Sequence, residues 1–102
     1  PGVAPAVFQV DLERMQITYR GLALSLTRHE FRLLQSLLEQ PERVFSREQL
    51  LDAVGVPADA GYERNIDSHI KSLRSKLRSV AAQAEPIQPH RGLGYSYSPS
   101  HS

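Results

Sequence analysis

The residues of this chain best suited to binding chemistry lie in the stretch 63–80, which reads ERNIDSHIKSLRSKLRSV. Its apolar residues recur at steps of four and three, the period of one stripe along an α-helix. The opposite face carries short polar side chains among cations: Arg64, Ser68, Lys71 and Ser75. Small side chains let a helix approach base edges in a DNA major groove, and flanking cations can meet phosphates. A solvated, basic surface helix is the alternative, and this stretch alone does not decide between the two.

Composition places the positive charge on and after this helix. The chain has 102 residues, 40% of them hydrophobic, and a formal net charge of only +1. Residues 1–62 hold six Arg and eight acidic residues (net −2), whereas residues 63–102 hold six Lys or Arg and three acidic residues (net +3). The length predicts one domain with a modest core. The uneven charge indicates a local cationic footprint rather than a generally basic protein.

The chain has no cysteine, which excludes a disulfide framework or a thiolate metal site within it and suits a cytoplasmic protein. No apolar run approaches the ~20 residues of a membrane span, and no signal peptide is visible. The chain lacks an initiator Met and opens with PGVAPA. We therefore expect a fragment of a longer protein, with residues 1–6 a linker remnant, residues 7–99 the domain and residues 100–102 a tail.

Three short β-rich segments come first, at residues 7–11, 16–19 and 22–26, and predict a small antiparallel sheet. A capping box, Thr27 to Glu30, then opens an apolar helical pattern that should end near Gln40, before Pro41. A second capping box begins at Ser46 and opens a shorter helix that ends at Gly55.

After the long helix, residues 87–89 and 95–97 are β-rich and flank a Gly-containing turn, which predicts a terminal hairpin with Arg91 at its tip. The order is therefore strands, two helices, a longer helix and a hairpin. This order is typical of an α+β winged helix-turn-helix, with an N-terminal antiparallel sheet, three helices and a C-terminal wing.

Four motifs spread along the chain resemble the OmpR/PhoB-type DNA-binding domains of two-component response regulators. They read LTRHEFRLL (26–34), PERVFSREQLL (41–51), ERNIDSHIKSLRSKL (63–77) and HRGLGYSY (90–97). In that family they mark the first helix, the second helix, the recognition helix and the wing. The phrases DSHIKSLRSKLR and HRGLGYS resemble those of CreB-like regulators.

The resemblance implies a four-stranded N-terminal sheet and a phosphorylatable receiver domain upstream, acted on by a sensor histidine kinase. It also implies transcriptional regulation through double-stranded DNA, with head-to-tail dimers on direct repeats. The loop 55–62 would contact RNA polymerase, although Gly55 replaces an aromatic residue often found there. The resemblance implies no cofactor.

Matching positions also imply roles for single residues. The phosphate contacts would be Arg64, His69, Lys71 and Arg74. The residues near base edges would be Asn65, Asp67, Ser68 and Ser72. Arg91 would enter the minor groove. Asn65 stands where Thr is common and Ser72 where some relatives have Arg, so the resemblance does not carry over an operator sequence.

Several of these residues have a second interpretation. His69 lies about 60° from the apolar stripe at 100° per residue, which also fits a histidine at the boundary of the core. Asp67 could pair with Lys71, four residues on, or accept from a cytosine amino group, and we favour the pair. Arg91 could be a solubilising charge. The whole domain could be a winged-helix protein-interaction module instead of a DNA-binding one.

Catalysis has little support in the sequence. Asp67 and His69 lie two positions apart on a helix and point to different sides, so they cannot form a Ser-His-Asp relay. His29 and Glu30 are adjacent, which is a poor spacing for shared metal ligation. We therefore expect neither an enzyme nor a metal site.

Overall fold

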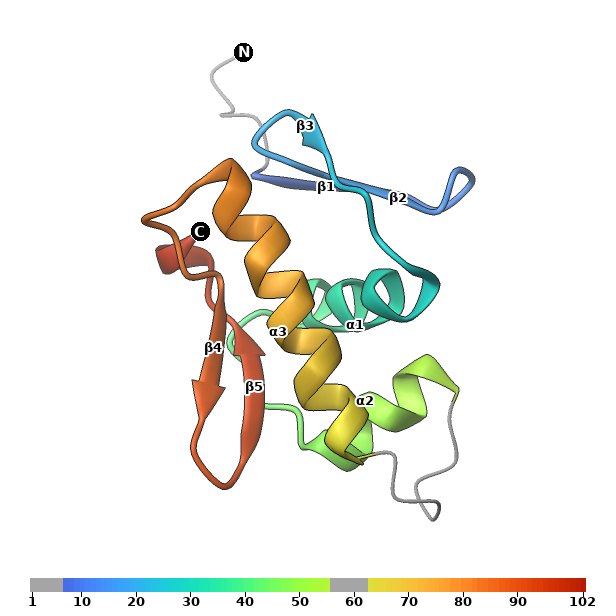
Figure 1. Cartoon of the computed structure of the whole chain (residues 1–102), viewed down its shortest axis with the longest axis vertical. Helices are drawn as coiled ribbons and strands as arrows, with labels where there is room; N and C mark the ends of the chain where they lie inside the picture. The colour runs from blue at the N-terminus through green and yellow to red at the C-terminus, as the bar shows by residue number, and fades with distance from the viewer. Residues whose placement is uncertain (1–6, 56–62) are drawn as a thin grey trace.

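The computed structural model describes residues 7–55 and 63–102. A three-stranded sheet comes first, then three helices, then a hairpin and a short 3₁₀ turn, η2 (Pro99–His101). The strands and helices are β1 (Phe8–Asp11), β2 (Gln16–Tyr19), β3 (Leu22–Ala23), α1 (Arg28–Glu39), α2 (Arg47–Val54), α3 (Glu63–Val80), β4 (Ile87–His90) and β5 (Gly94–Tyr97). Figure 1 shows the β4–β5 hairpin on one side of α3 and the sheet on the other side, at the level of the C-terminal end of that helix. The fold is the α+β winged helix predicted from the order of elements.

The N-terminal sheet is smaller than the resemblance implied. Its strands pair antiparallel in the order β1-β2-β3, and the described residues contain three strands here rather than four. The strand expected over 22–26 is only two residues long. Leu24 still donates its N–H to the carbonyl of Ile17 at 3.0 Å. Beyond it the chain must leave the sheet to bring Thr27 to the start of α1, and this ends the pairing.

Both predicted capping boxes are confirmed. The Thr27 hydroxyl accepts from the Glu30 N–H and the Glu30 carboxylate accepts from the Thr27 N–H, at 3.2 and 2.8 Å. Ser46 and Gln49 make the same reciprocal pair at the start of α2. Gly55 ends α2 in the left-handed conformation, with φ of 80°. These contacts satisfy backbone groups at helix ends that would otherwise lack a partner, so the sequence alone determines where both helices begin.

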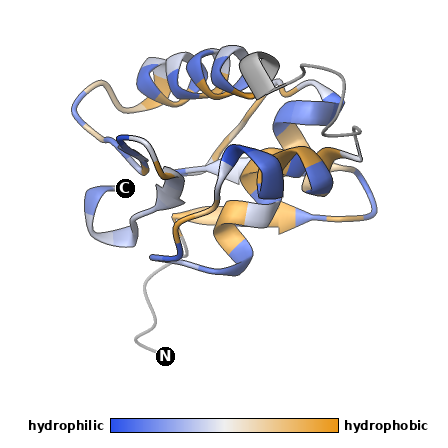
Figure 2. Cartoon of the chain, turned by 90° about the horizontal axis from the view of Figure 1, so that it is seen from below, coloured by the Kyte–Doolittle hydropathy of each residue, from blue (hydrophilic) through white to orange (hydrophobic). Residues whose placement is uncertain are grey.

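The predicted apolar stripe of α3 is buried. Ile66, Ile70, Leu73 and Leu77 are each no more than 1% exposed and pack into one core with α1, α2 and the sheet. In Figure 2 the hydrophobic parts of the helices gather toward the interior, and hydrophilic parts lie on the outer side of α3. Burial of this stripe fixes the rotation of α3 and therefore decides which residues face outward.

The wing, defined here as residues 87–97, is attached by backbone bonds to the segment between α1 and α2. Phe45 and Tyr95 form an isolated antiparallel bridge, with N–H to carbonyl distances of 2.8 and 2.9 Å in the two directions. The bridge requires glycine at 94, where a Cβ would lie 1.8 Å from the Phe45 carbonyl oxygen. The two wing strands pair as predicted, from Ile87 opposite Tyr97 to His90 opposite Gly94.

Candidate nucleic-acid interface

The outward face of α3 is made of short polar side chains and one lysine. Ser68, Lys71, Ser72 and Ser75 are all exposed. The sequence predicted this face, and burial of the opposite stripe produces it. The backbone of Arg64 and Asn65 belongs to the first turn of α3, but their side chains lie outside the described part of the chain, so their roles stay predictions.

The wing side of α3 is held by Asp67. Its Oδ1 accepts from the Arg47 Nε at 2.9 Å and from the Tyr95 hydroxyl at 2.6 Å. Asp67 does form an ion pair, but its partner among the described side chains is Arg47, at the start of α2, and not Lys71. Lys71 instead lies on the exposed face.

The same three groups perturb one another's pKa values. Partial burial by itself would raise the pKa of the Asp67 carboxyl, but the hydrogen bonds from Tyr95 and Arg47 outweigh it and hold the pKa below the ordinary value. Burial and the bond to Asp67 raise the pKa of Tyr95. The bond to Asp67 also raises the pKa of the Arg47 guanidinium. At neutral pH the site therefore holds an ionised carboxylate, a neutral phenol and a guanidinium cation.

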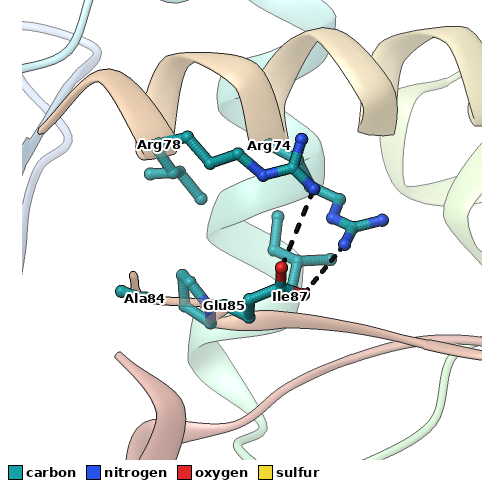
Figure 3. Close-up of a pocket in the computed structure, with 7 residues that line it drawn as sticks. Arg74, Arg78, Ala84, Glu85 and Ile87 are labelled. Atoms are coloured by element: carbon teal, nitrogen blue, oxygen red, sulfur yellow. Dashed lines mark hydrogen bonds and ion pairs between the residues drawn. The ribbon is translucent and has the colours of Figure 1, made fainter. Parts of the chain in front are cut away.

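Further along the same side, Arg74 and Arg78 both face Glu85, which lies just before the wing. Arg74 makes the shorter ion pair, 3.0 Å against 3.8 Å for Arg78. Figure 3 shows the two guanidinium groups converging on the Glu85 carboxylate. The small cleft beneath them has a volume of about 10 Å³, about enough for one water molecule. Arg74, predicted to contact a phosphate, is paired here with Glu85 of the same chain.

The other side of α3 packs against the start of α1. His69 is half-buried, and its ring meets that of His29 edge to face, with centroids 5.1 Å apart. This contact favours the boundary interpretation of His69. Lys76 forms an ion pair with Glu30, whose side chain is only 2% exposed.

Glu30 therefore caps α1 and anchors α3 with the same carboxylate. Burial alone would raise its pKa, but the hydrogen bonds from Lys76 and from the Thr27 N–H, with the Ser72 hydroxyl nearby, lower the pKa from 4.5 to about 2. The carboxylate stays ionised at all but strongly acidic pH. The ion pair consequently fixes α3 against α1 under ordinary conditions.

The wing projects Arg91 outward. Arg91, Gly92 and Leu93 at its turn are all exposed, and the Leu93 side chain keeps 65% of its surface accessible. An exposed cation beside an exposed apolar side chain at a hairpin tip suits contact with a groove, where both types of side chain are used. The structure leaves the predicted wing arginine free of ion pairs within the described residues.

Residues 21–97 match the protein family described as "Transcriptional regulatory protein, C terminal". The chain belongs to this family. The transcriptional regulatory protein CreB of Escherichia coli strain K12 is 47% identical over 89 residues, which cover 87% of this chain and 39% of CreB. This chain therefore corresponds to less than half of that relative. The OmpR/PhoB-type resemblance is confirmed, and CreB is among the similar proteins.

Solved structures of response-regulator DNA-binding domains share the fold. The DNA-binding domain of AdeR, solved in complex with an intercistronic region, superposes with a TM-score of 0.80 at 28% identity, over 94% of this chain and 98% of that one. The DNA-binding domain of RstA from Klebsiella pneumoniae, in complex with the RstA box, gives a TM-score of 0.78 at 25% identity, over 95% and 96%.

Sequence reasoning about this response-regulator domain missed four contributors to the site. They are Glu30, Arg47, Lys76 and Tyr95. The capping box pointed to a local role for Glu30, and nothing along the chain showed that Lys76 would reach it from another helix. Arg47 and Tyr95 lie inside the matched motifs, but their link to Asp67 spans 20 and 28 residues.

Two further properties concern ligands and membranes. The described residues contain no cluster of three or more His, Cys, Asp or Glu side chains that could hold a metal ion. Over the same residues, no helix has the length and apolar character needed to cross a bilayer.

Proposed function

We propose that this domain binds double-stranded DNA in a sequence-specific way and regulates transcription, with α3 in the major groove and the wing tip in the adjacent minor groove. The observation that carries the proposal is the outward face of α3. It combines three small hydroxyl side chains, Ser68, Ser72 and Ser75, with the exposed cation Lys71. Small groups permit close approach to base edges, and a cation at their border can neutralise a phosphate.

The site residues then have different roles. Ser68 and Ser72 approach base edges, Lys71 contacts a phosphate, and Arg91 enters the minor groove. Arg74 reaches a phosphate only by leaving Glu85, from which it lies 3.0 Å. The phosphate roles of Arg64 and His69 and the base contact of Asn65 remain part of the proposal on the family resemblance alone.

The wider proposal follows the family. The domain acts as the output part of a cytoplasmic regulator whose receiver domain is phosphorylated by a sensor kinase. It binds direct repeats as a head-to-tail dimer and contacts RNA polymerase. The segment proposed for the polymerase contact lies largely outside the described residues. The structures of AdeR with an intercistronic region and of RstA with its box support the DNA-binding part of this proposal. The dimer, the direct repeats and the polymerase contact rest on the family resemblance.

Salt dependence of DNA binding tests the proposed surface. Each phosphate neutralised contributes about 0.9 to the slope of log K against log salt. Lys71→Ala should therefore reduce the slope by about 0.9 per domain and weaken binding to all duplexes alike. The measurement is a fluorescence titration of labelled duplex at several salt concentrations.

Arg14→Ala is the matched control, because it also removes one positive charge, but from the β1–β2 turn, where Arg14 is 79% exposed. The control should leave the salt slope unchanged. An equal reduction of the salt slope in both variants would mean that DNA binding depends on the net charge of the domain and not on the position of Lys71. No loss in folded Lys71→Ala would remove this face from the DNA surface and favour the protein-interaction module.

A further inference from the structure

Asp67 joins three elements through one oxygen atom. Its Oδ1 accepts from the Tyr95 hydroxyl on β5 at 2.6 Å and from the Arg47 Nε on α2 at 2.9 Å. The triangle is closed by Arg47 itself, whose guanidinium carbon lies 5.9 Å from the centre of the Tyr95 ring. The second turn of α3, the first residue of α2 and strand β5 of the wing therefore meet at a single carboxylate.

The backbone attaches the wing to a different part of the molecule. Tyr95 pairs through its N–H and carbonyl with Phe45, in the segment before α2. This bridge places the wing strand but does not reach α3. Wing residues Ile87 and Tyr97 belong to the same apolar core as the buried stripe of α3. Among the described hydrogen bonds and ion pairs, side chains join the wing region to α3 at two points: Glu85 with Arg74 and Arg78 near the C-terminal end of the helix, and Tyr95 with Asp67 in its N-terminal half.

We propose that Asp67 is a positioning residue, which sets the wing and the outward face of α3 at one fixed spacing so that both enter neighbouring grooves together. This inference rests on the proposed function and assigns Asp67 a different part in it from reading a base. A carboxylate oxygen that already accepts from two donors is oriented toward α2 and the wing. Asp67 then affects DNA affinity indirectly: it holds Tyr95 in place, and the position of Tyr95 in turn sets that of Arg91 at the wing tip.

The two roles predict different behaviour of conservative variants. Asp67→Asn keeps an acceptor oxygen but removes the charge that strengthens the bonds from Arg47 and Tyr95, and Tyr95→Phe removes one of the two donors. Both changes alter the shape little, and the Phe45 bridge should keep both variants folded. If Asp67 positions the wing, each variant should weaken DNA binding by about tenfold. The double variant should bind DNA no more weakly than either single variant, because the effects of residues in one network are not additive. The variants should also keep the sequence preference of the parent.

A second cycle uses the wing tip. Arg91→Ala should cost much less affinity in the Asp67→Asn background than in the parent, because a wing that is no longer held against α3 contributes less to begin with. Asp11→Asn, on the exposed β1–β2 hairpin, is the charge-matched control and should couple to neither residue. Affinities and preferences come from titration and selection with pools of duplexes of randomised sequence.

A readout without DNA separates this inference from the proposed function. In hydrogen exchange, the amides of Phe45 and Tyr95 should exchange about tenfold faster in Asp67→Asn and Tyr95→Phe, and those of β1 and β2 should not change. If the parent bound no duplex, the proposed function would fail, and faster exchange would still establish that Asp67 holds the wing. Unchanged exchange would overturn the inference. So would a changed base preference in Asp67→Asn with a silent Tyr95→Phe, which would return Asp67 to base reading.

Discussion

The ion pair between Glu30 and Lys76 should make the stability of this domain depend on pH in a defined way. Glu30→Gln is the informative change, because glutamine keeps an oxygen for the Thr27 N–H and so preserves the helix cap, while the charge facing Lys76 is lost. The pKa of Glu30 falls from 4.5 to about 2 on folding. At about 1.4 kcal/mol per pKa unit, the ionised carboxylate stabilises the folded state by about 3 kcal/mol at neutral pH.

That figure is an upper value, since the Lys76 side chain is 33% exposed and water screens part of the attraction. We expect Glu30→Gln to lower the free energy of unfolding by about 2 kcal/mol at pH 7, a large share of the ~5–15 kcal/mol typical of a domain. Urea unfolding followed by circular dichroism measures this directly. With a urea slope of about 1–3 kcal/mol per molar, the midpoint should fall by roughly 1–2 M.

The sign of the pH dependence follows from the lowered pKa. The stabilisation by Glu30 is fully present above about pH 4.5, and it is lost as the pH falls toward about 2, where the folded state also binds the proton. The parent should therefore lose stability relative to Glu30→Gln across this window, and the two curves should converge at its lower end. Glu39→Gln, an exposed change on the same helix, should shift stability by no more than about 0.5 kcal/mol. Equal urea midpoints for parent and Glu30→Gln at pH 7, or a gap that persists at pH 2, would refute the reasoning.

Two further variants test the wing. Gly94→Ala should destabilise the domain by several kcal/mol, because the added Cβ would lie 1.8 Å from the Phe45 carbonyl oxygen, whereas Gly92→Ala, with nothing within 4 Å, should cost only the ~1–2 kcal/mol of a positive φ. Thermal unfolding compares them, and similar losses would contradict the close approach at residue 94. Arg91→Ala should leave the melting temperature unchanged and weaken binding most for duplexes with A/T-rich flanks, because a narrow minor groove concentrates negative potential. Titrations with A/T-rich and G/C-rich flanks measure this, and equal losses would make Arg91 an ordinary phosphate contact.

Local signals in the sequence were enough to determine the elements and the buried face of α3. Capping boxes at Thr27 and Ser46 act over three residues, and the stripe from Ile66 to Val80 repeats about once per helical turn. Interactions of this range depend only on the conformation of their own segment, so they can be read without knowing what packs where. The strand predicted over 22–26 is present but shorter, at Leu22–Ala23, because its length depends on where α1 has to begin in space.

Only the tertiary structure decided which polar residues of α3 form contacts with other elements and which stay exposed. On the helix alone, Lys71 was a cation within reach of Asp67, four residues on. Packing of α2 and the wing instead brought Arg47 and Tyr95 to that carboxylate, from 20 and 28 residues away. In the same way, Lys76 forms an ion pair with Glu30, which lies 46 residues earlier in the chain. Helical periodicity determines the direction in which each side chain leaves the helix. Which residue it meets there depends on where the neighbouring elements lie, and burial of the whole core sets their positions.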